Sequence, residues 1–188
     1  MLGWVGLLER LKRRCICLRD HAHPSNNLGK ATTLLEQAIP LYRDLKSLVN
    51  LCYALLVLCD LMLRQGNQLA VTKLLQELGT ICPQVEEAGC NICFYWLSAA
   101  VMQQQQNHAK ALRLSAVANT WLSKPGLDAS FEKGESNPFI QAQSTMFFTS
   151  EQLQRFESQA RSLSPQQAMQ YALGQTEIFE DFPVGQSG

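Results

Sequence analysis

The sequence predicts an all-α fold, an α-solenoid of antiparallel helix pairs, and two observations lead to this class. The first is a repeat: Asn27, Asn67 and Asn107 head three related segments that start 40 residues apart. The second is spacing, because apolar residues recur at intervals of three and four along each segment, as in a helix that buries one stripe. One helical hairpin cannot bury such a stripe alone, so stacked copies are expected to share a core.

The expected helices follow the repeat along the chain. The stretch from Trp4 to Ala22 stands where the first helix of the earliest unit belongs, although a basic amphipathic helix of this kind can also bind a membrane surface or a partner. Residues 51–65 and 91–105 are predicted as the first helices of the next two units. The second helices are predicted at residues 28–45, 68–82 and 108–122.

Each second helix is expected to bury one apolar stripe. The residues of these stripes are Ala31, Leu34, Leu35 and Ala38, then Val71, Leu74, Leu75 and Leu78, then Ala111, Leu114 and Ala118. Pro40 interrupts the first of these helices and is expected to kink or end it, because its ring removes a backbone donor.

The chain is expected to divide into four parts. These are helical repeats with a period of 40 over residues 1–123, a variable loop over 124–148, a closing helix pair over 149–173 and a flexible tail over 174–188. In the closing pair, Thr149 with Gln152 and Ser164 with Gln167 have the spacing of capping boxes. Ser164 is therefore interpreted as a helix cap and not as a nucleophile.

Composition excludes several classes of function. Sixteen basic residues balance sixteen acidic ones, so no overall field favours nucleic acid or an anionic membrane. No stretch reaches the roughly 18 uncharged apolar residues that span a bilayer, and a cytoplasmic protein is expected. Phosphate-binding loops, dinucleotide fingerprints, nucleophile elbows and metalloprotease motifs are all missing from the sequence. We therefore expect a protein that is not an enzyme and uses no cofactor.

The seven cysteines leave a different chemistry open. An odd number spread over helical segments is unlike a disulfide framework, and the main interpretation is small buried hydrophobic residues. The weak candidates for metal ligands are Cys15, Cys17, His21 and His23, whose spacing matches no standard zinc module. A metal-binding or redox protein would require Cys15 and Cys17 to converge with Cys90 and Cys93.

The repeat resembles the tetratricopeptide-repeat family. Around Gly66 the matching residues are Leu58 and Cys59 in the first helix, then Val71, Leu75 and Leu78 in the second, and Pro83 at the close. In the next unit they are Tyr95, Ala99, Ala111 and Ala118. The period is longer than the standard 34 residues, and Val71 and Leu78 are larger than the family prefers. The resemblance implies a right-handed superhelix.

A longer period of this kind is similar to the C-terminal repeat regions of STAND-class signalling ATPases, including LuxR-type bacterial transcription regulators. Residues 110–122 resemble the arginine-leucine segment of those regions, and residues 149–173 resemble their closing helices. The resemblance covers about residues 27–173 and implies a non-enzymatic regulatory region that binds proteins, peptides or neighbouring domains, and neither nucleic acid nor membrane. A stand-alone adaptor is the alternative.

In tetratricopeptide repeats the first helix of each unit lines a concave groove for a partner. Carried over by position, the partner-binding residues here are Tyr53, Leu56, Asp60, Leu63, Arg64, Cys93, Trp96, Ala100, Gln103 and Gln104. Leu56, Asp60, Trp96 and Ala100 replace the family's carboxylate clamp, so the resemblance implies a mixed apolar groove. Trp96 is the expected anchor, with core packing as its alternative.

Overall fold

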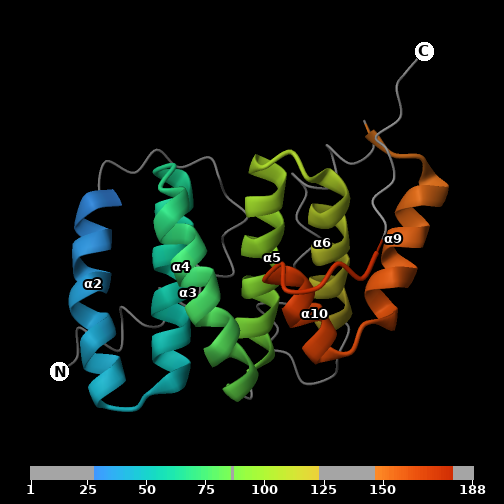
Figure 1. Cartoon of the computed structure of the whole chain (residues 1–188). Helices are drawn as coiled ribbons and strands as arrows, with labels where there is room; N and C mark the ends of the chain where they lie inside the picture. Colours follow the sequence, from blue (N-terminus) through green and yellow to red (C-terminus); the bar gives the residue numbers. More distant parts are fainter. Residues whose placement is uncertain (1–27, 86, 123–146, 180–188) are drawn as a thin grey trace. The chain divides into compact units, whose positions relative to one another are not determined.

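A computed structural model describes residues 28–85, 87–122 and 147–179 of the chain. All regular secondary structure in these ranges is helical, which confirms the all-α class (Figure 1). The elements are α2 (Leu28–Asp44), α3 (Leu48–Arg64), α4 (Gln68–Ile81), the 3₁₀ turn η2 (Cys82–Gln84), α5 (Ala88–Gln104), α6 (His108–Leu122), α9 (Ser150–Ser162) and α10 (Pro165–Ala172). The predicted helix at Trp4–Ala22, most of the variable loop and the end of the tail lie outside the described residues.

The chain forms two compact units, one ending at Phe94 and the other beginning at Tyr95, so that α5 contributes to both. In the first unit α3 packs against both α2 and α4. Every residue of α3 from Leu51 to Leu63 is buried. A helix that is apolar on all sides is stable only when it is covered on all sides, and α3 accordingly forms the centre of this unit.

Helix α2 runs from Leu28 to Asp44, close to its predicted range, and it does not end at Pro40, so a kink is the effect still expected of that residue. Pro40 is exposed, so the carbonyl group that loses its usual helical donor can bind water instead. The predicted buried stripe is wrong at Leu34, which is 46% exposed, whereas Leu35 and Ala38 are buried as expected.

The turns that follow α3 and α5 have the same hydrogen bonds. After α3, the Gly66 N–H donates to the Leu63 carbonyl at 3.1 Å, and the Asn67 N–H donates to the Met62 carbonyl at 3.0 Å. The corresponding pairs after α5 are Gln106 to Gln103 at 3.1 Å and Asn107 to Met102 at 2.9 Å. This is the Schellman arrangement, which needs a left-handed residue after the helix; φ is +72° at Gly66 and +62° at Gln106.

Each of these turns ends in an asparagine that caps the next helix. The Asn67 Oδ1 accepts from the Ala70 N–H at 3.2 Å, and the Asn107 Oδ1 accepts from the Lys110 N–H at 3.0 Å. Both bonds satisfy a donor that the first helical turn leaves without a partner. The shared asparagine of the sequence repeat thus has a local structural role at both positions.

In the second unit α6 packs against α9 and α10. Phe148 and Phe156 meet edge to face, with their ring centroids 5.1 Å apart, and they form a small core with Ala109. Both predicted capping boxes are confirmed, at Thr149 before α9 and at Ser164 before α10. These boxes fix where the two closing helices begin.

Candidate partner-binding surface

The predicted groove residues are mostly buried. On α3, Tyr53, Leu56, Asp60 and Leu63 are each at most 6% exposed. On α5, Cys93 is buried and Trp96 is 9% exposed. Arg64, Ala100 and Gln103 are partly exposed, and Gln104 is exposed. Their assignment to a partner-binding face remains a prediction.

Asp60 lies inside the first unit as half of an ion pair. Its Oδ2 is 2.9 Å from the Nε of Arg64, one turn further along α3. The Asp60 side chain is 6% exposed and that of Arg64 is 23% exposed, so the arginine lies closer to solvent. A carboxylate buried in this way needs such a partner, which gives Asp60 a structural role that the sequence did not indicate.

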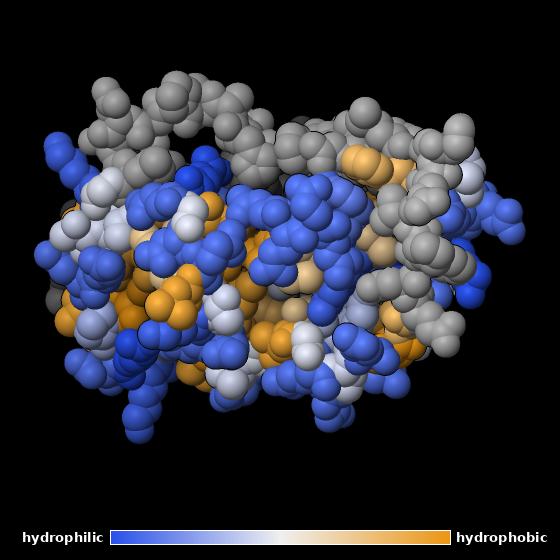
Figure 2. All heavy atoms as spheres, turned by 45° about the horizontal axis from the view of Figure 1, so that its top comes forward, coloured by the Kyte–Doolittle hydropathy of each residue, from blue (hydrophilic) through white to orange (hydrophobic). Residues whose placement is uncertain are grey.

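An apolar surface instead lies along α2 and the turn that follows it. We call it the α2 leucine face; it consists of Leu34, Leu41 and Leu45, which are 46%, 50% and 74% exposed. Their spacing of seven and four residues places them on one side of a helix. On the side of Figure 2 where α2 lies, hydrophobic side chains reach the surface between hydrophilic ones.

The repeat shows that this exposure is unusual. Positions 40 residues further along the chain from Leu41 and Leu45 are Ile81 and Val85, which are only 8% and 5% exposed. Leu114, which lies two periods after Leu34, is fully buried. Leu74 and Trp121, the other described equivalents, are partly exposed. The side chains of later repeats are thus all more covered than those of the α2 leucine face.

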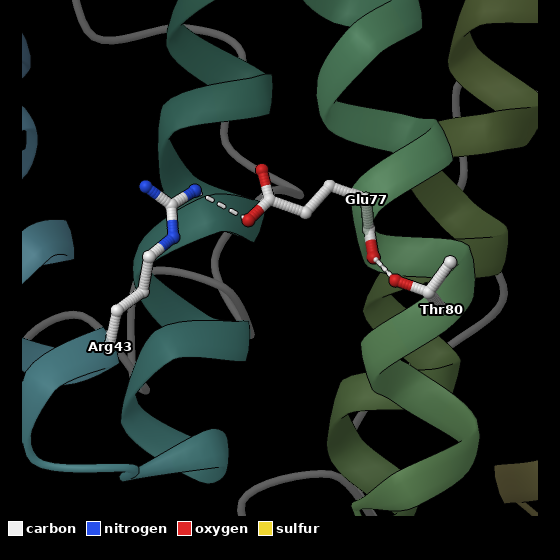
Figure 3. A network of polar contacts seen from close by, with 3 residues as sticks. All are labelled: Arg43, Glu77 and Thr80. Carbon is white, nitrogen blue, oxygen red and sulfur yellow. Dashed lines mark hydrogen bonds and ion pairs between the residues drawn. The ribbon is translucent and has the colours of Figure 1, made fainter.

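A polar contact connects α2 to α4. The Nη2 of Arg43 on α2 donates to the Oε1 of Glu77 on α4 at 2.5 Å, and the Thr80 hydroxyl donates to the Glu77 backbone carbonyl at 2.7 Å (Figure 3). The Arg43 side chain is half exposed, so the pair adds little stability by itself. Arg43 is two residues from both Leu41 and Leu45, so it lies on the opposite side of the helix from the α2 leucine face.

The second unit contains a fully buried arginine. Arg113 is 0% exposed; its Nε donates to Gln159 Oε1 at 3.0 Å and its Nη1 donates to the Tyr171 hydroxyl at 3.1 Å. The guanidinium also lies over the rings of Phe156 and Phe179, 4.8 and 5.1 Å from their centroids. Cation–π contacts of this kind strengthen when water is excluded, and Arg113 thus joins α6 to α9, α10 and the start of the tail.

His108, the first residue of α6, packs against an aromatic ring. Its ring stacks on Phe147 with the centroids 4.4 Å apart, and its Nδ1 lies 3.1 Å from the Gln103 Oε1. These contacts hold the ring beside the turn between α5 and α6. They give it a packing role.

The cysteines come together in a set that the sequence did not indicate. Cys15, Cys17, His21 and His23 lie outside the described residues. Cys90 is buried but lies beside Cys52 and Cys82, and the Sγ atoms of Cys52 and Cys82 are 3.5 Å apart. Hydrogen bonds to Cys82 and Cys90, followed by burial, raise the pKa of the Cys52 thiol far above its ordinary value. Within the described ranges no group of three or more His, Cys, Asp or Glu residues has a geometry that could hold a metal ion.

A neighbouring tyrosine shares this environment. The Tyr53 hydroxyl donates to the Glu87 Oε1 at 3.1 Å. Burial, with the charges of Cys90, Glu87 and Cys93, raises the pKa of Tyr53 far above its ordinary value. Tyr53 is therefore a neutral hydrogen-bond donor that ties α3 to the segment before α5, and it is not a proton-transfer group.

Comparison with known proteins leaves the family open. No protein-family model, no curated protein and no solved structure matches the chain. Of the helices that the structure describes, none combines the length and the apolar character needed to cross a membrane. The repeat and the geometry of the two units are consequently the basis for any functional proposal.

Proposed function

We propose that this chain is a non-enzymatic protein-binding domain, the regulatory repeat region of a larger signalling ATPase or transcription regulator. In this proposal the helices form antiparallel pairs that stack as a tetratricopeptide-like solenoid. Equal 17-residue lengths of α3 and α5 and identical turns after them support this arrangement. One observation carries the binding function: the α2 leucine face is exposed, whereas the equivalent described residues of later repeats are buried or only partly exposed.

The partner that fits this face is an α-helix with its own apolar stripe. The leucines lie beside the buried stripe of α2, so a helix placed next to them would extend the existing core. Burying the exposed parts of Leu41 and Leu45, which are 50% and 74% exposed, would contribute about 2–3 kcal/mol.

The test is affinity capture from the cells that make the protein, followed by titration of the purified partner. The double variant Leu41→Glu/Leu45→Glu should weaken binding at least tenfold, since a loss of about 1.4 kcal/mol has that effect. Leu69→Glu is the matched control, because Leu69 is 70% exposed on α4 and lies outside the leucine face. It should bind like the wild type, and circular dichroism should show equal helix content in all three proteins.

Two outcomes would overturn the proposal. If a captured partner binds the double variant as tightly as the wild type, the leucine face is not its binding site. If no partner is captured and the double variant instead melts at a lower temperature, the face is covered within the chain. Trp96→Ala, measured in parallel, tests the groove that the family resemblance implies.

A further inference from the structure

The thiols of Cys52, Cys82 and Cys90 form a cluster inside the first unit. Cys52 belongs to α3, Cys82 begins the 3₁₀ turn after α4, and Cys90 lies near the start of α5. All three side chains are 0% exposed. The Cys52 and Cys82 Sγ atoms are 3.5 Å apart. The Cys52 thiol also makes a hydrogen bond with the Cys90 thiol. Residues 30 positions apart in sequence are thus within reach of a covalent bond.

The pair needs little rearrangement to form that bond. The S–S length of a disulfide is about 2.05 Å, so the two sulfur atoms must approach each other by roughly 1.5 Å. Side-chain rotation at two cysteines can supply a movement of this size. Cys59 is the internal comparison, because it lies two turns further along α3 and is equally buried, but beside Asp60.

Access for an oxidant comes from the end of α4. Cys82 is followed directly by Pro83 and Gln84, which are exposed, in a turn of only three residues. Short terminal turns open locally far more often than a whole domain unfolds. Opening of η2 would expose Cys82 while α3 remains in place.

We infer that Cys52 and Cys82 are an oxidation site at which a peroxide forms a disulfide that locks α3 to the end of α4. In the first step a thiol of the pair attacks the peroxide; the O–O bond breaks and leaves a sulfenic acid and water. In the second step the other thiol attacks the sulfenic sulfur, the S–S bond forms and a second water leaves. The two thiols lose two protons and two electrons, and one hydrogen peroxide is reduced to two waters.

The bond can be mapped directly on the full chain. Reduced protein is treated with excess hydrogen peroxide, remaining thiols are alkylated, and the protein is digested with trypsin and a glutamate-specific protease. Cleavage after Lys46 and Arg64 isolates residues 47–64, which contain Cys52 and Cys59. Cleavage after Glu77 and Glu87 separates Cys82 from Cys90. Mass spectrometry should find residues 47–64 joined to the peptide that contains Cys82.

Matched variants identify the cysteines. Cys59→Ser should still form the cross-link, whereas Cys52→Ala and Cys82→Ala should each lose it while keeping the helix content of the wild type. Oxidised wild-type protein should melt roughly 5–15 °C higher than reduced protein, and the two alanine variants should show no such rise. Absence of the cross-link in the wild type, its loss in Cys59→Ser, or a predominant bond to Cys90 would overturn the inference. A cross-link with no rise in Tm would refute the claim that the disulfide holds α3 to the end of α4.

Discussion

The Schellman turns after α3 and α5 allow a direct test of backbone strain, because the first has glycine and the second glutamine at the left-handed position. Gln106 has a φ of +62°, and Gly66 has a φ of +72°. A residue with a side chain lowers the stability of the fold by about 1–2 kcal/mol in this left-handed conformation. Glycine avoids that cost, but its flexibility in the unfolded chain lowers stability by about 0.5–1 kcal/mol relative to alanine. The difference predicts that Gln106→Gly stabilises the protein by about 0.5–1 kcal/mol.

The reverse substitution should have the reverse effect. A Cβ atom built on Gly66 meets nothing within 4 Å, so Gly66→Ala introduces no clash and changes only the backbone energy. We expect it to destabilise the protein by about 0.5–1 kcal/mol. Urea unfolding followed by circular dichroism at 222 nm measures both effects as shifts of the midpoint at constant slope.

Gln105→Gly is the control for the first substitution. Gln105 is exposed in the same turn, and among the described non-glycine residues only Lys46 and Gln106 have a positive φ. Glycine at position 105 should therefore destabilise the protein. The reasoning would be refuted if Gln106→Gly lowered the midpoint as Gln105→Gly does, because position 106 would then carry no strain for glycine to relieve.

Three further predictions concern the caps, the buried arginine and the thiols. Asn67→Ala and Asn107→Ala should each lower the unfolding free energy by about 1 kcal/mol, measured by the same urea titration. Arg113→Ala should destabilise the protein by about 3 kcal/mol, because its partners Gln159 and Tyr171 would lose their donor. The control is Arg161→Ala, at a side chain that is 71% exposed, and it should change stability by less than about 0.5 kcal/mol. Burial, and after it the charge of the adjacent Asp60, raises the pKa of the Cys59 thiol from 9.0 to about 12. The contribution of the neutral Cys59 thiol to the unfolding free energy should be full below pH 9. It should fall as the pH rises, by up to about 1.4 kcal/mol per pH unit. Cys59→Ala should flatten that fall in unfolding measured between about pH 8 and 11, and an unchanged slope would refute the assignment.

Features set by neighbouring residues were predictable from the sequence. The helices near residues 51–65, 68–82, 91–105 and 108–122 follow from apolar spacing and from the polar turns between them, and the structure has a helix in each place. The capping boxes at Thr149 and Ser164 depend on residues only three positions apart. A short sequence window contains all the information that such features need.

Features set by packing between helices were not predictable. Arg113 stands among apolar residues of α6, and nothing within that helix indicates that α9 and α10 supply its partners. The Cys52–Cys82 pair depends on how the start of α3 meets the end of α4. Leu34 follows the buried pattern of its helix and is nevertheless exposed. In each case the outcome depends on which element covers a given face, and a single sequence does not state this.

The burial of α3 bears on where a partner can bind. A helix whose residues Leu51–Leu63 are all buried cannot present a groove without exposing the centre of its own unit. The side chains that stay within reach of solvent are at the two ends of the helix, as at Leu48, which is 38% exposed, and Arg64, whose side chain is 23% exposed. Helix α2 has the opposite property, because the α2 leucine face is open while the rest of its apolar surface is already packed. Binding there would require no rearrangement of the unit, whereas binding along α3 would require part of the core to open. A partner that binds along α3 should therefore associate slowly and change the exchange of buried amide hydrogens, and one that binds the leucine face should do neither.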